Sequence, residues 1–464
     1  MPRVDQLAVT LLDVVPRRPD GTVDVLAVAD ALAPAVLLAM LEGAGWTYVV
    51  PSTSRRFVDD GTRAVLIDAD GVHELGTDPF AALDGLCERL GLHPSAGADD
   101  DLPPFSGGLV GAFVYELSRR IETLGARARR DRGHDDIWLM LAEDVVAIDP
   151  AGETARLVHR ELPTGARKEP IAPIRERLRH ATPFAPSPRA VGGTARSSLS
   201  REAYLAAVAT ILEHIAAGEV FQVNLTQRLT AAWDDSPLAL YAALSQASPA
   251  PMGACLPELG IASISPETFL SVDGGTITTR PIKGTRPRHR DPHLDAALAD
   301  DLATSAKDRA ENIMVVDMER NDLGRICVPG SIHVPRLLDV ESHPTVWHLV
   351  SSVVGKLRAE TGYGAMLRAT FPCGSVTGAP KVAAMQIIDR REPVTRGWYC
   401  GAIGFLSAGQ ASLSVGIRTA TVQPDGQVDY GAGGGIVADS DPQAEFAECQ
   451  DKAAAFFAAV GARP

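Results

Sequence analysis

The sequence has few aromatic residues and a deficit of positive charge. Of its 464 residues 5% are aromatic, and 58 Asp and Glu outnumber 44 Lys and Arg, which gives a formal net charge of -14. Binding nucleic acid without sequence preference needs a surplus of Lys and Arg facing the phosphates. We therefore expect no nucleic-acid partner, and a small anionic substrate would need a locally positive site.

Cysteine pairs and long apolar runs are also missing. The six cysteines form no C-x-x-C pair, and no histidine cluster stands at zinc spacing. This usage is typical of a reducing compartment, so we expect a cytoplasmic protein. Asp5 and Asp13 interrupt the first apolar stretch, so we expect no signal peptide. No segment reaches about 18 uncharged apolar residues, so we expect no membrane span.

Three familiar catalytic motifs are absent. GSVTGAPK (residues 374–381) has the wrong spacing for a phosphate-binding loop and lacks the hydroxyl for magnesium, and GAGGGI lacks the third glycine of a dinucleotide fingerprint. There is no G-x-S-x-G elbow. These absences disfavour a nucleotide-dependent enzyme and a serine hydrolase.

The composition that remains, 45% hydrophobic and 22% charged, is typical of a soluble globular protein. The length allows two ordinary domains, or one large domain of interleaved halves. Pro, Gly and Ser replace any hydrophobic period in residues 181–198. We therefore divide the chain into an N-terminal α/β region (1–180), a linker (181–199) and a catalytic region (200–464).

Hydrophobic periodicity places the main elements. Strands are expected at 46–52, 64–71, 220–231 and within 262–288, and helices at 78–92 and 302–324. Ser200 can cap a helix whose apolar residues share one face and which Gly218 ends.

Acidic residues line two of the expected helices. Asp308 and Glu311 are one turn apart, and Glu445, Glu448 and Lys452 follow each other at steps of three and four. Two such faces could close on magnesium, which prefers a few carboxylates, water and a substrate oxygen. By itself, each pattern is more typical of a solvated helix face.

A lysine and a glycine run are further candidates. Lys283 follows an alternating stretch and precedes Gly284, so it resembles a side chain that a strand end presents to a pocket, although it could simply be exposed. A neutral amine there would be a nucleophile. In the run Tyr430–Val437 the glycines could let backbone N–H groups approach an anion, or could form a tight loop.

Seven blocks, taken in order, resemble the chorismate-utilising enzyme family over about residues 200–460. They are SPETFL (265–270), PIKGTRPR (281–288), KDRAENIMVVDMERNDLGR (307–325), FPCGSVTGAPK (371–381), RGWYCGAIGF (396–405), SVGIRTA (414–420) and GAGGGIVADSDPQAEFAECQDK (431–452). The resemblance implies an α+β fold in which two large antiparallel sheets stack with helices on the outside, and the N-terminal half wraps the C-terminal half.

The resemblance also implies roles for individual residues. Glu311 and Glu448 match the ligands of Mg²⁺, with Glu445 and Asp308 close by, and Glu267 matches the acid that protonates the departing C4 hydroxyl of chorismate. The positions that match substrate-binding residues are Thr377, Tyr399, Arg418, Gly433, Gly434, Gly435 and Lys452. Arg418 would supply a guanidinium fork for a carboxylate.

Lys283 indicates which reaction to expect. Anthranilate-forming members usually carry alanine here, whereas members that form 4-amino-4-deoxychorismate, a precursor of 4-aminobenzoate and folate, carry a lysine that adds to the ring. Gln222 matches the amine-using members, because members that activate water have a second lysine there. The alternatives are an anthranilate-forming enzyme, an isochorismate- or salicylate-forming enzyme, and a binding homologue without turnover.

The source of ammonia is expected on another chain. Amino-transferring members of the family receive it from a glutamine amidotransferase, whose nucleophile lies in a G-x-C-x-G turn. No such turn exists here, because Trp398 and Tyr399 precede Cys400. The expected partners are chorismate, ammonia and a separate amidotransferase subunit.

Overall fold

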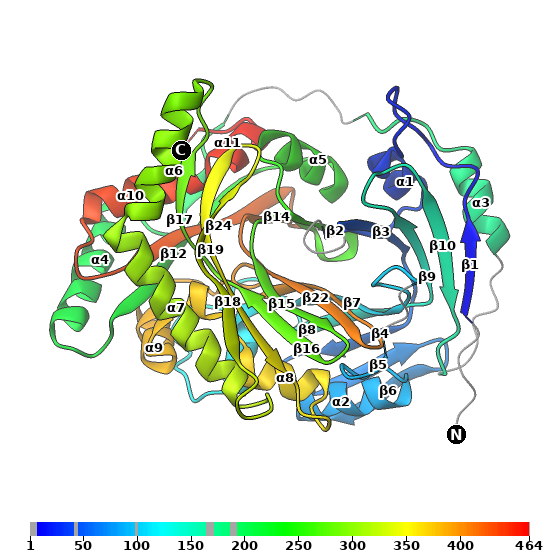
Figure 1. Ribbon diagram of the computed structural model, residues 1–464, viewed down its shortest axis with the longest axis horizontal. Coiled ribbons are helices and arrows are strands. Elements are labelled where there is room, and N and C mark those ends of the chain that lie inside the picture. The colour runs from blue at the N-terminus through cyan, green and yellow to red at the C-terminus, as the bar shows by residue number, and fades with distance from the viewer. Residues whose placement is uncertain (1–6, 41–44, 98–100, 164–170, 186–192, 464) are drawn as a thin grey trace.

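The structure is a computed structural model that describes residues 7–40, 45–97, 101–163, 171–185 and 193–463. Its strands form two large antiparallel sheets with helices on the outside (Figure 1). This is the architecture expected from the sequence. The predicted linker lies partly outside the described residues.

The first sheet combines strands from both halves of the chain. In the order of their hydrogen-bonded neighbours they are β1 (Leu7–Leu11), β10 (Ala155–Arg160), β9 (Asp144–Ile148), β3 (Trp46–Pro51), β2 (Ala35–Met40), β13 (Met252–Leu256), β14 (Ile261–Ser265), β23 (Thr419–Val422), β24 (Gln427–Ile436), β12 (Gln222–Ala232) and β11 (Arg196–Ser197), while β20 (Gly378–Ala379) also pairs with β12.

The second sheet also combines strands from both halves of the chain. Its order is β17 (Ile282–Pro287), β19 (Val346–Lys356), β16 (Thr276–Arg280), β15 (Thr268–Asp273), β22 (Gln410–Val415), β21 (Ala402–Leu406), β7 (Gly108–Phe113), β8 (Ile137–Ala142), β4 (Arg56–Asp59), β5 (Ala64–Asp68) and β6 (Gly71–Gly76), while β18 (His333–Ser342) also pairs with β19.

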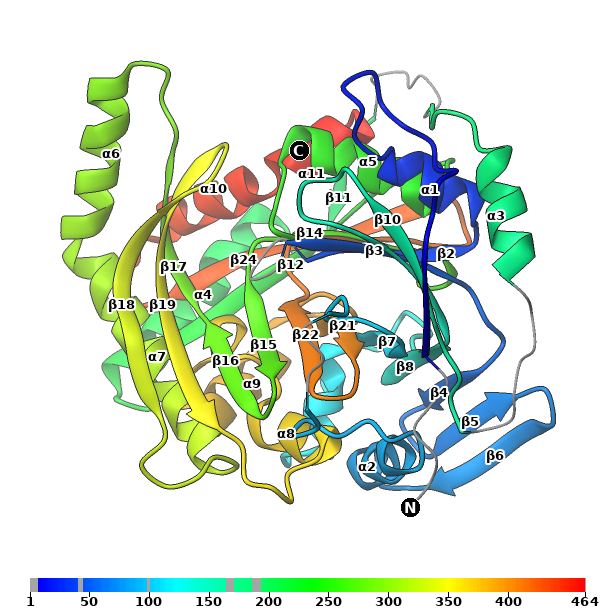
Figure 2. The same cartoon turned by 45° about the vertical axis from the view of Figure 1, so that its right-hand side comes forward.

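Helices cover the outer faces of both sheets. The described α-helices are α1 (Val25–Ala31), α2 (Pro79–Arg89), α3 (Ile171–Arg179), α4 (Arg201–Ala216), α5 (Pro237–Ala247), α6 (Pro292–Thr304), α7 (Ala306–Gly324), α8 (Tyr363–Thr370), α9 (Lys381–Arg391), α10 (Pro442–Lys452) and α11 (Ala454–Val460), with short 3₁₀ turns η1 (Tyr115–Arg120), η2 (Pro257–Leu259) and η3 (Gly374–Val376). Helices α4, α5 and α10 pack on the first sheet, and α6 and α7 on β17 and β19 of the second (Figure 2).

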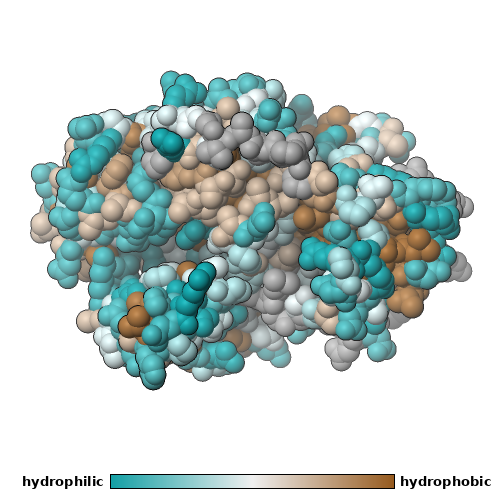
Figure 3. All heavy atoms as spheres, turned by 90° about the horizontal axis from the view of Figure 1, so that it is seen from above, coloured by the Kyte–Doolittle hydropathy of each residue, from teal (hydrophilic) through white to brown (hydrophobic). Residues whose placement is uncertain are grey.

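The apolar core between the sheets draws on both halves of the chain. Leu38 and Tyr48 of the first sheet meet Trp138 and Phe405 of the second in one buried cluster. Seen from above, polar side chains cover much of the surface, while apolar ones gather in the middle of this face and in a patch at its right (Figure 3). Among the described helices, none combines the length and apolarity that a membrane crossing requires.

Most predicted elements are confirmed, and two details are corrected. Ser200 caps α4, because its hydroxyl accepts the backbone N–H of Ala203 at 3.2 Å. Lys283 is the second residue of β17, so it lies at a strand end as predicted. The helix predicted at 302–324 is two helices, since Ser305 ends α6 and caps α7. The run Gly433–Gly435 forms no tight loop but continues β24, paired with β12.

Candidate active site

The site lies where the chain crosses between the two sheets. Strand β14 of the first sheet leads into β15 of the second, and β22 leads back into β23. Glu267 lies on the first crossing and Arg418 on the second. The crossings run side by side, because Val415 N–H donates to the Glu267 carbonyl at 3.0 Å and Ile264 N–H donates to the Arg418 carbonyl at 3.0 Å.

Glu267 is a buried carboxyl. It is 3% exposed. Burial raises its pKa to about 7, although a hydrogen bond from Ser375 and the charge of Lys283 act in the opposite direction. The Ile282 N–H also donates to its Oε1 at 3.4 Å. A carboxyl that keeps its proton near neutral pH can act as a general acid.

Lys283 points from β17 toward this carboxyl and toward two helices. Its Nζ donates to the Ser375 carbonyl at 3.3 Å and is partly buried. Its charge influences the carboxyls of Glu267, Glu311 and Glu448. The structure therefore brings the predicted acid, the predicted nucleophile and two predicted metal ligands into one neighbourhood.

Gly284 explains how Lys283 can approach helix α7. At φ +88° a side chain would be strained, and an added Cβ would lie 2.9 Å from the Cβ and Cγ of Asp308. The register of β17 against β19 also shifts between Ile282 and Thr285. The glycine and the irregularity together bring the lysine-bearing strand against the acidic helix.

The turn around η3 lies in contact with Lys283. Ser375 contacts both Lys283 and Glu267. Thr377 is fully buried, and its hydroxyl donates to the Gly374 carbonyl at 3.0 Å. Sequence reasoning singled out Thr377 but missed Ser375, whose role depends on contacts with segments about 90 residues or more away in the chain.

The predicted metal ligands lie on α7 and α10. Burial raises the pKa of Glu311, against the influence of Lys283 and Lys307. Partial burial would raise the pKa of Glu448, but Lys452, Lys307 and Lys283 together outweigh burial, and the pKa is lowered. Glu445 is 4% exposed and accepts a hydrogen bond from the Ser440 hydroxyl at 2.6 Å.

Lysines neutralise these carboxylates. Lys452 Nζ lies 2.8 Å from Glu448 Oε1, and Lys307 Nζ lies 3.6 Å from Glu445 Oε1. Within the described part of the chain, no three His, Cys, Asp or Glu side chains converge closely enough to enclose a metal ion. Magnesium commonly uses one or two protein carboxylates with water and substrate oxygens. Glu311 and Glu448 are hard oxygen donors on two helices that the Lys307–Glu445 pair links, and they fit that smaller requirement.

The glycines of β24 lie beside this cluster. Lys452 Nζ donates to the Gly433 carbonyl at 2.9 Å. An added Cβ at Gly434 would lie 3.4 Å from both Glu445 Oε2 and Lys452 Nζ, and one at Gly435 would lie 2.8 Å from Gln222 Nε2. Gln222 is 1% exposed, and neither polar atom of its amide has a partner among the described residues. This amide is available to a small polar ligand.

Arg418 and the residue after Tyr399 have unusual backbone conformations. Arg418 has φ +51°, and Cys400, next to Tyr399, has φ +62°, a region that non-glycine residues rarely adopt. Arg418 is hydrogen-bonded to Tyr430. The Tyr399 ring lies against Gly431, where an added Cβ would come within 2.2 Å of it. Such strained positions cluster at binding sites.

His348 of β19 is a neighbour that sequence reasoning missed. It is 7% exposed, and its Nδ1 lies 3.0 Å from the Thr285 hydroxyl. Burial lowers its pKa to about 4, and the charges of His343 and Arg418 act in the same direction. It is therefore a neutral hydrogen-bonding group near Arg418. A single histidine in a strand carries no sequence signal of this placement.

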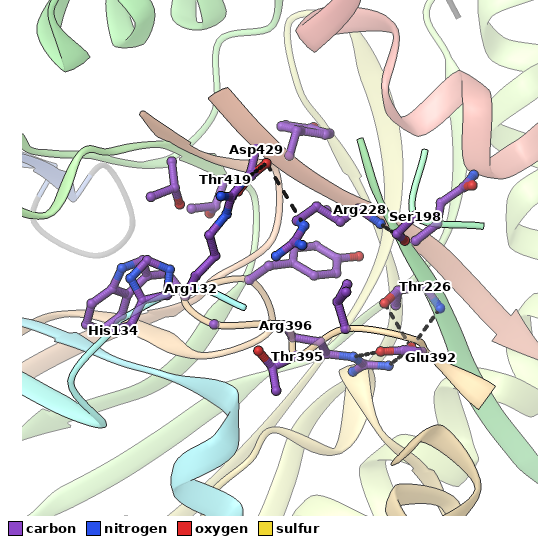
Figure 4. Close-up of a pocket in the computed structure, with 18 of the residues that line it drawn as sticks. Arg132, His134, Ser198, Thr226, Arg228, Glu392, Thr395, Arg396, Thr419 and Asp429 are labelled. Atoms are coloured by element: carbon purple, nitrogen blue, oxygen red, sulfur yellow. Dashed lines mark hydrogen bonds and ion pairs between the residues drawn. The ribbon is translucent and has the colours of Figure 1, made fainter. Parts of the chain in front are cut away.

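A small pocket adjoins the site (Figure 4). Of the predicted site residues only Tyr399 lines it. Its charged groups pair with one another: Arg132 Nε lies 2.7 Å from Asp429, and Arg396 Nη2 lies 2.6 Å from Glu392 (Figure 4). The pocket is thus a neighbour of the predicted catalytic residues and does not contain them.

The site combines a buried acid, a primary amine and carboxylates from two helices. It lies where the chain crosses between the two sheets, beside an arginine. This combination is typical of an enzyme site for a small anionic substrate. Over residues 61–458 the chain matches the chorismate binding enzyme family. It belongs to this family and is a chorismate-utilising enzyme.

Curated relatives with two different activities are about equally similar. The chain is 41% identical to aminodeoxychorismate synthase component 1 of Salmonella typhimurium, over 81% of each chain. It is 39% identical to anthranilate synthase component 1 of Streptomyces coelicolor, over 83% of this chain and 78% of the relative. The structure of anthranilate synthase component I from Streptococcus pneumoniae aligns with a TM-score of 0.76 at 28% identity, over 88% of this chain and 92% of the other.

Proposed function

We propose that the chain is the synthase subunit that converts chorismate and ammonia to 4-amino-4-deoxychorismate, a precursor of 4-aminobenzoate and folate. The observation that carries this proposal is the placement of Lys283 beside Glu267. Its Nζ contacts the Ser375 carbonyl at 3.3 Å, and Ser375 also hydrogen-bonds to Glu267. The proposed displacement uses an amine as nucleophile and an acid for the leaving group, and here the two share one contact residue.

The proposed reaction proceeds by two displacements. Lys283 adds through its neutral amine to C2 of the ring while the C4–O bond breaks, and Glu267 gives its proton to the oxygen, which leaves as water. The proton that the new C2–N ammonium releases restores Glu267. Ammonia then bonds to C4 as the C2–N bond breaks, and a proton from its nitrogen passes to the lysine nitrogen. The net change is ammonia in and water out.

The remaining site residues bind and orient the substrate. Arg418 and Lys452 supply positive charge for its carboxylates, while Thr377, Tyr399 and the N–H groups of β24 shape the ring pocket. Glu311 and Glu448, with Glu445 beside them, would hold Mg²⁺, whose charge would stabilise the departing oxygen and a substrate carboxylate. These assignments rest on the family resemblance and on the positions of the side chains.

The ammonia is proposed to come from a separate glutamine amidotransferase subunit. The sequence has no amidotransferase nucleophile turn. The Salmonella relative is named component 1 of its synthase, which supports a second component.

Anthranilate formation is the second candidate. It is supported by the Streptomyces relative, whose identity of 39% is close to that of the aminodeoxychorismate synthase relatives. It would leave Lys283 as a bystander. The proposed function is preferred because Lys283 contacts the partner of the buried acid.

The deciding experiment is product identification. Purified protein is incubated with chorismate, Mg²⁺ and ammonium, and then with glutamine and a purified amidotransferase, and the products are separated and weighed by mass spectrometry. We expect 4-amino-4-deoxychorismate without release of pyruvate. Anthranilate or salicylate with pyruvate would retain the family and refute the proposed reaction.

A further inference from the structure

A second buried carboxyl lies on α7 beneath the catalytic turn. Glu319 is fully buried, and its Oε1 accepts the Gly374 N–H at 2.9 Å and the Cys373 thiol at 3.5 Å. Its Oε2 has no hydrogen-bond partner among the described residues. Burying a carboxyl group costs free energy unless its oxygens are hydrogen-bonded. A buried carboxyl with one unpaired oxygen is therefore a candidate for a functional role.

The turn that Glu319 holds carries the contacts to the catalytic pair. Cys373 Sγ lies 3.2 Å from the Ser375 hydroxyl. Ser375 hydrogen-bonds to Glu267, and its carbonyl accepts from Lys283 at 3.3 Å. A continuous chain of contacts therefore leads from Glu319 through Cys373 and Ser375 to both reacting side chains.

The approach of Glu319 to the turn is close. An added Cβ at Gly374 would lie 2.9 Å from Glu319 Oε1 and 3.3 Å from Met318 Cε. A side chain at position 374 would have to displace the end of the Glu319 or Met318 side chain. Glycine therefore lets the backbone N–H reach the Glu319 carboxyl without moving it.

A second link ties the same turn to the same helix. Lys381 pairs with Asp322, one turn after Glu319 on α7, and also donates to the carbonyls of Thr370 at 3.0 Å and Pro372 at 2.9 Å. Both ends of the turn are therefore attached to α7. Glu311 lies eight residues before Glu319, about 12 Å along a rigid helix.

We propose that Glu319 is a positioning residue: it holds the turn from Cys373 to Thr377 so that Ser375 contacts Lys283 and Glu267 at the same time. This inference rests on the proposed roles of those two residues. Burial, and then the neighbouring Asp322, raise the pKa of Glu319. Glutamine, which keeps an acceptor oxygen without charge, is therefore a close substitute.

The test compares Glu319→Gln and Glu319→Leu with a matched control, Glu143→Leu. Glu143 is also a buried carboxyl that accepts a backbone N–H, from Leu162 at 3.0 Å, but it lies in the N-terminal half. For each variant the kcat and KM for chorismate consumption, the thermal unfolding and the hydrogen exchange of the peptide containing Gly374 are measured.

We expect Glu319→Leu to lower kcat about tenfold or more, with KM within about twofold, and to speed exchange at Gly374. Glu319→Gln should retain kcat within about threefold, and Glu143→Leu should lose stability without losing kcat. Wild-type kcat in folded Glu319→Leu, or an equal loss in Glu319→Gln, would overturn the inference. If the wild type consumes no chorismate, the proposed function fails, and hydrogen exchange alone tests the positioning role of Glu319. Unchanged exchange at Gly374 in Glu319→Leu would then refute that role, and faster exchange would support it.

Discussion

At the scale of single residues, Lys283 and Glu267 depend on each other. The lysine charge counteracts the effect of burial on the carboxyl, and both side chains meet at Ser375. Neither residue stands out in the sequence without the other, because a lone lysine or glutamate is usually a surface group. Their pairing in a buried setting supports a chemical role for both.

The first prediction concerns the nucleophile. Lys283→Ala should lower the formation of 4-amino-4-deoxychorismate by roughly a thousandfold or more, because it removes the amine that is proposed to form the covalent bond to the ring. Product formation by chromatography and the mass of the intact protein during turnover are the measurements. The control is Lys356→Ala, at the exposed end of β19. Unchanged turnover in Lys283→Ala would remove the covalent step.

The second prediction concerns the acid and pH. The pKa of Glu267 is about 7 in the folded chain against 4.5 for an unperturbed carboxyl. Folding therefore favours the protonated form, so the resulting stability is fully present below pH 4.5 and is lost as the pH rises through 7. The wild type should lose about 1.4 kcal/mol of unfolding free energy per pH unit relative to Glu267→Gln across this window.

Denaturant unfolding at several pH values measures this difference. Glu360→Gln, at an exposed position, is the control and should parallel the wild type. Parallel curves for Glu267→Gln and the wild type would show that Glu267 is already ionised when folded. Glu267→Gln should also lower turnover about 10² to 10⁴-fold, because it cannot donate a proton to the leaving oxygen.

At the scale of elements, α7 connects the proposed metal ligands to the turn that contacts Lys283 and Glu267. One face of this helix carries Asp308 and Glu311 near its start and Glu319 and Asp322 near its end. Helix α10 carries Glu448 and Lys452. A shift of α7 would move Glu311 and the turn around Ser375 together.

The third prediction tests these two helices as a metal site. Glu311→Gln and Glu448→Gln should each weaken Mg²⁺ binding at least about tenfold, since each removes an anionic oxygen donor. Isothermal calorimetry of the chain without substrate, repeated with chorismate, is the measurement. Asp317→Asn is the control, because this exposed carboxylate on α7 pairs with Arg320 away from the site. Equal Mg²⁺ affinity in all variants would place the ion elsewhere.

At the scale of the whole molecule, the two halves share both sheets. Strand β13 pairs with β2, where Ala254 is opposite Leu38, and β21 pairs with β7, where Gly404 is opposite Gly111. The inter-sheet core takes residues from each half. The proposed catalytic residues lie in the second half, but the sheets that hold them are completed by the first.

The fourth prediction follows from this sharing. Residues 200–464 expressed alone should be unfolded or aggregated, because two central strands would become open edges and apolar core would be exposed. Co-expression with residues 1–180 should restore soluble protein and chorismate consumption. Solubility, circular dichroism and activity are the measurements. A soluble and active second half would show that it folds independently.

The helices and strands were largely predictable because local patterns determine them. The cap at Ser200, the strand over 220–231 and the helix over 78–92 follow from short-range hydrogen bonding and hydrophobic period. The break at Ser305 was missed, because a good N-cap inside a long helical pattern gives the same periodicity before and after it.

The family, the expected sheets and the candidate residues could be inferred before the structure, because seven blocks in a fixed order carry the family resemblance, and the resemblance implies the rest. Three relations come from the three-dimensional structure alone. Glu267 and Arg418 lie on adjacent sheet crossings, Lys283 and Glu267 meet at Ser375, and Glu319 holds the same turn. These relations depend on burial and on contacts between distant segments. No local pattern encodes them, since a side chain's environment is set by what the whole chain packs around it.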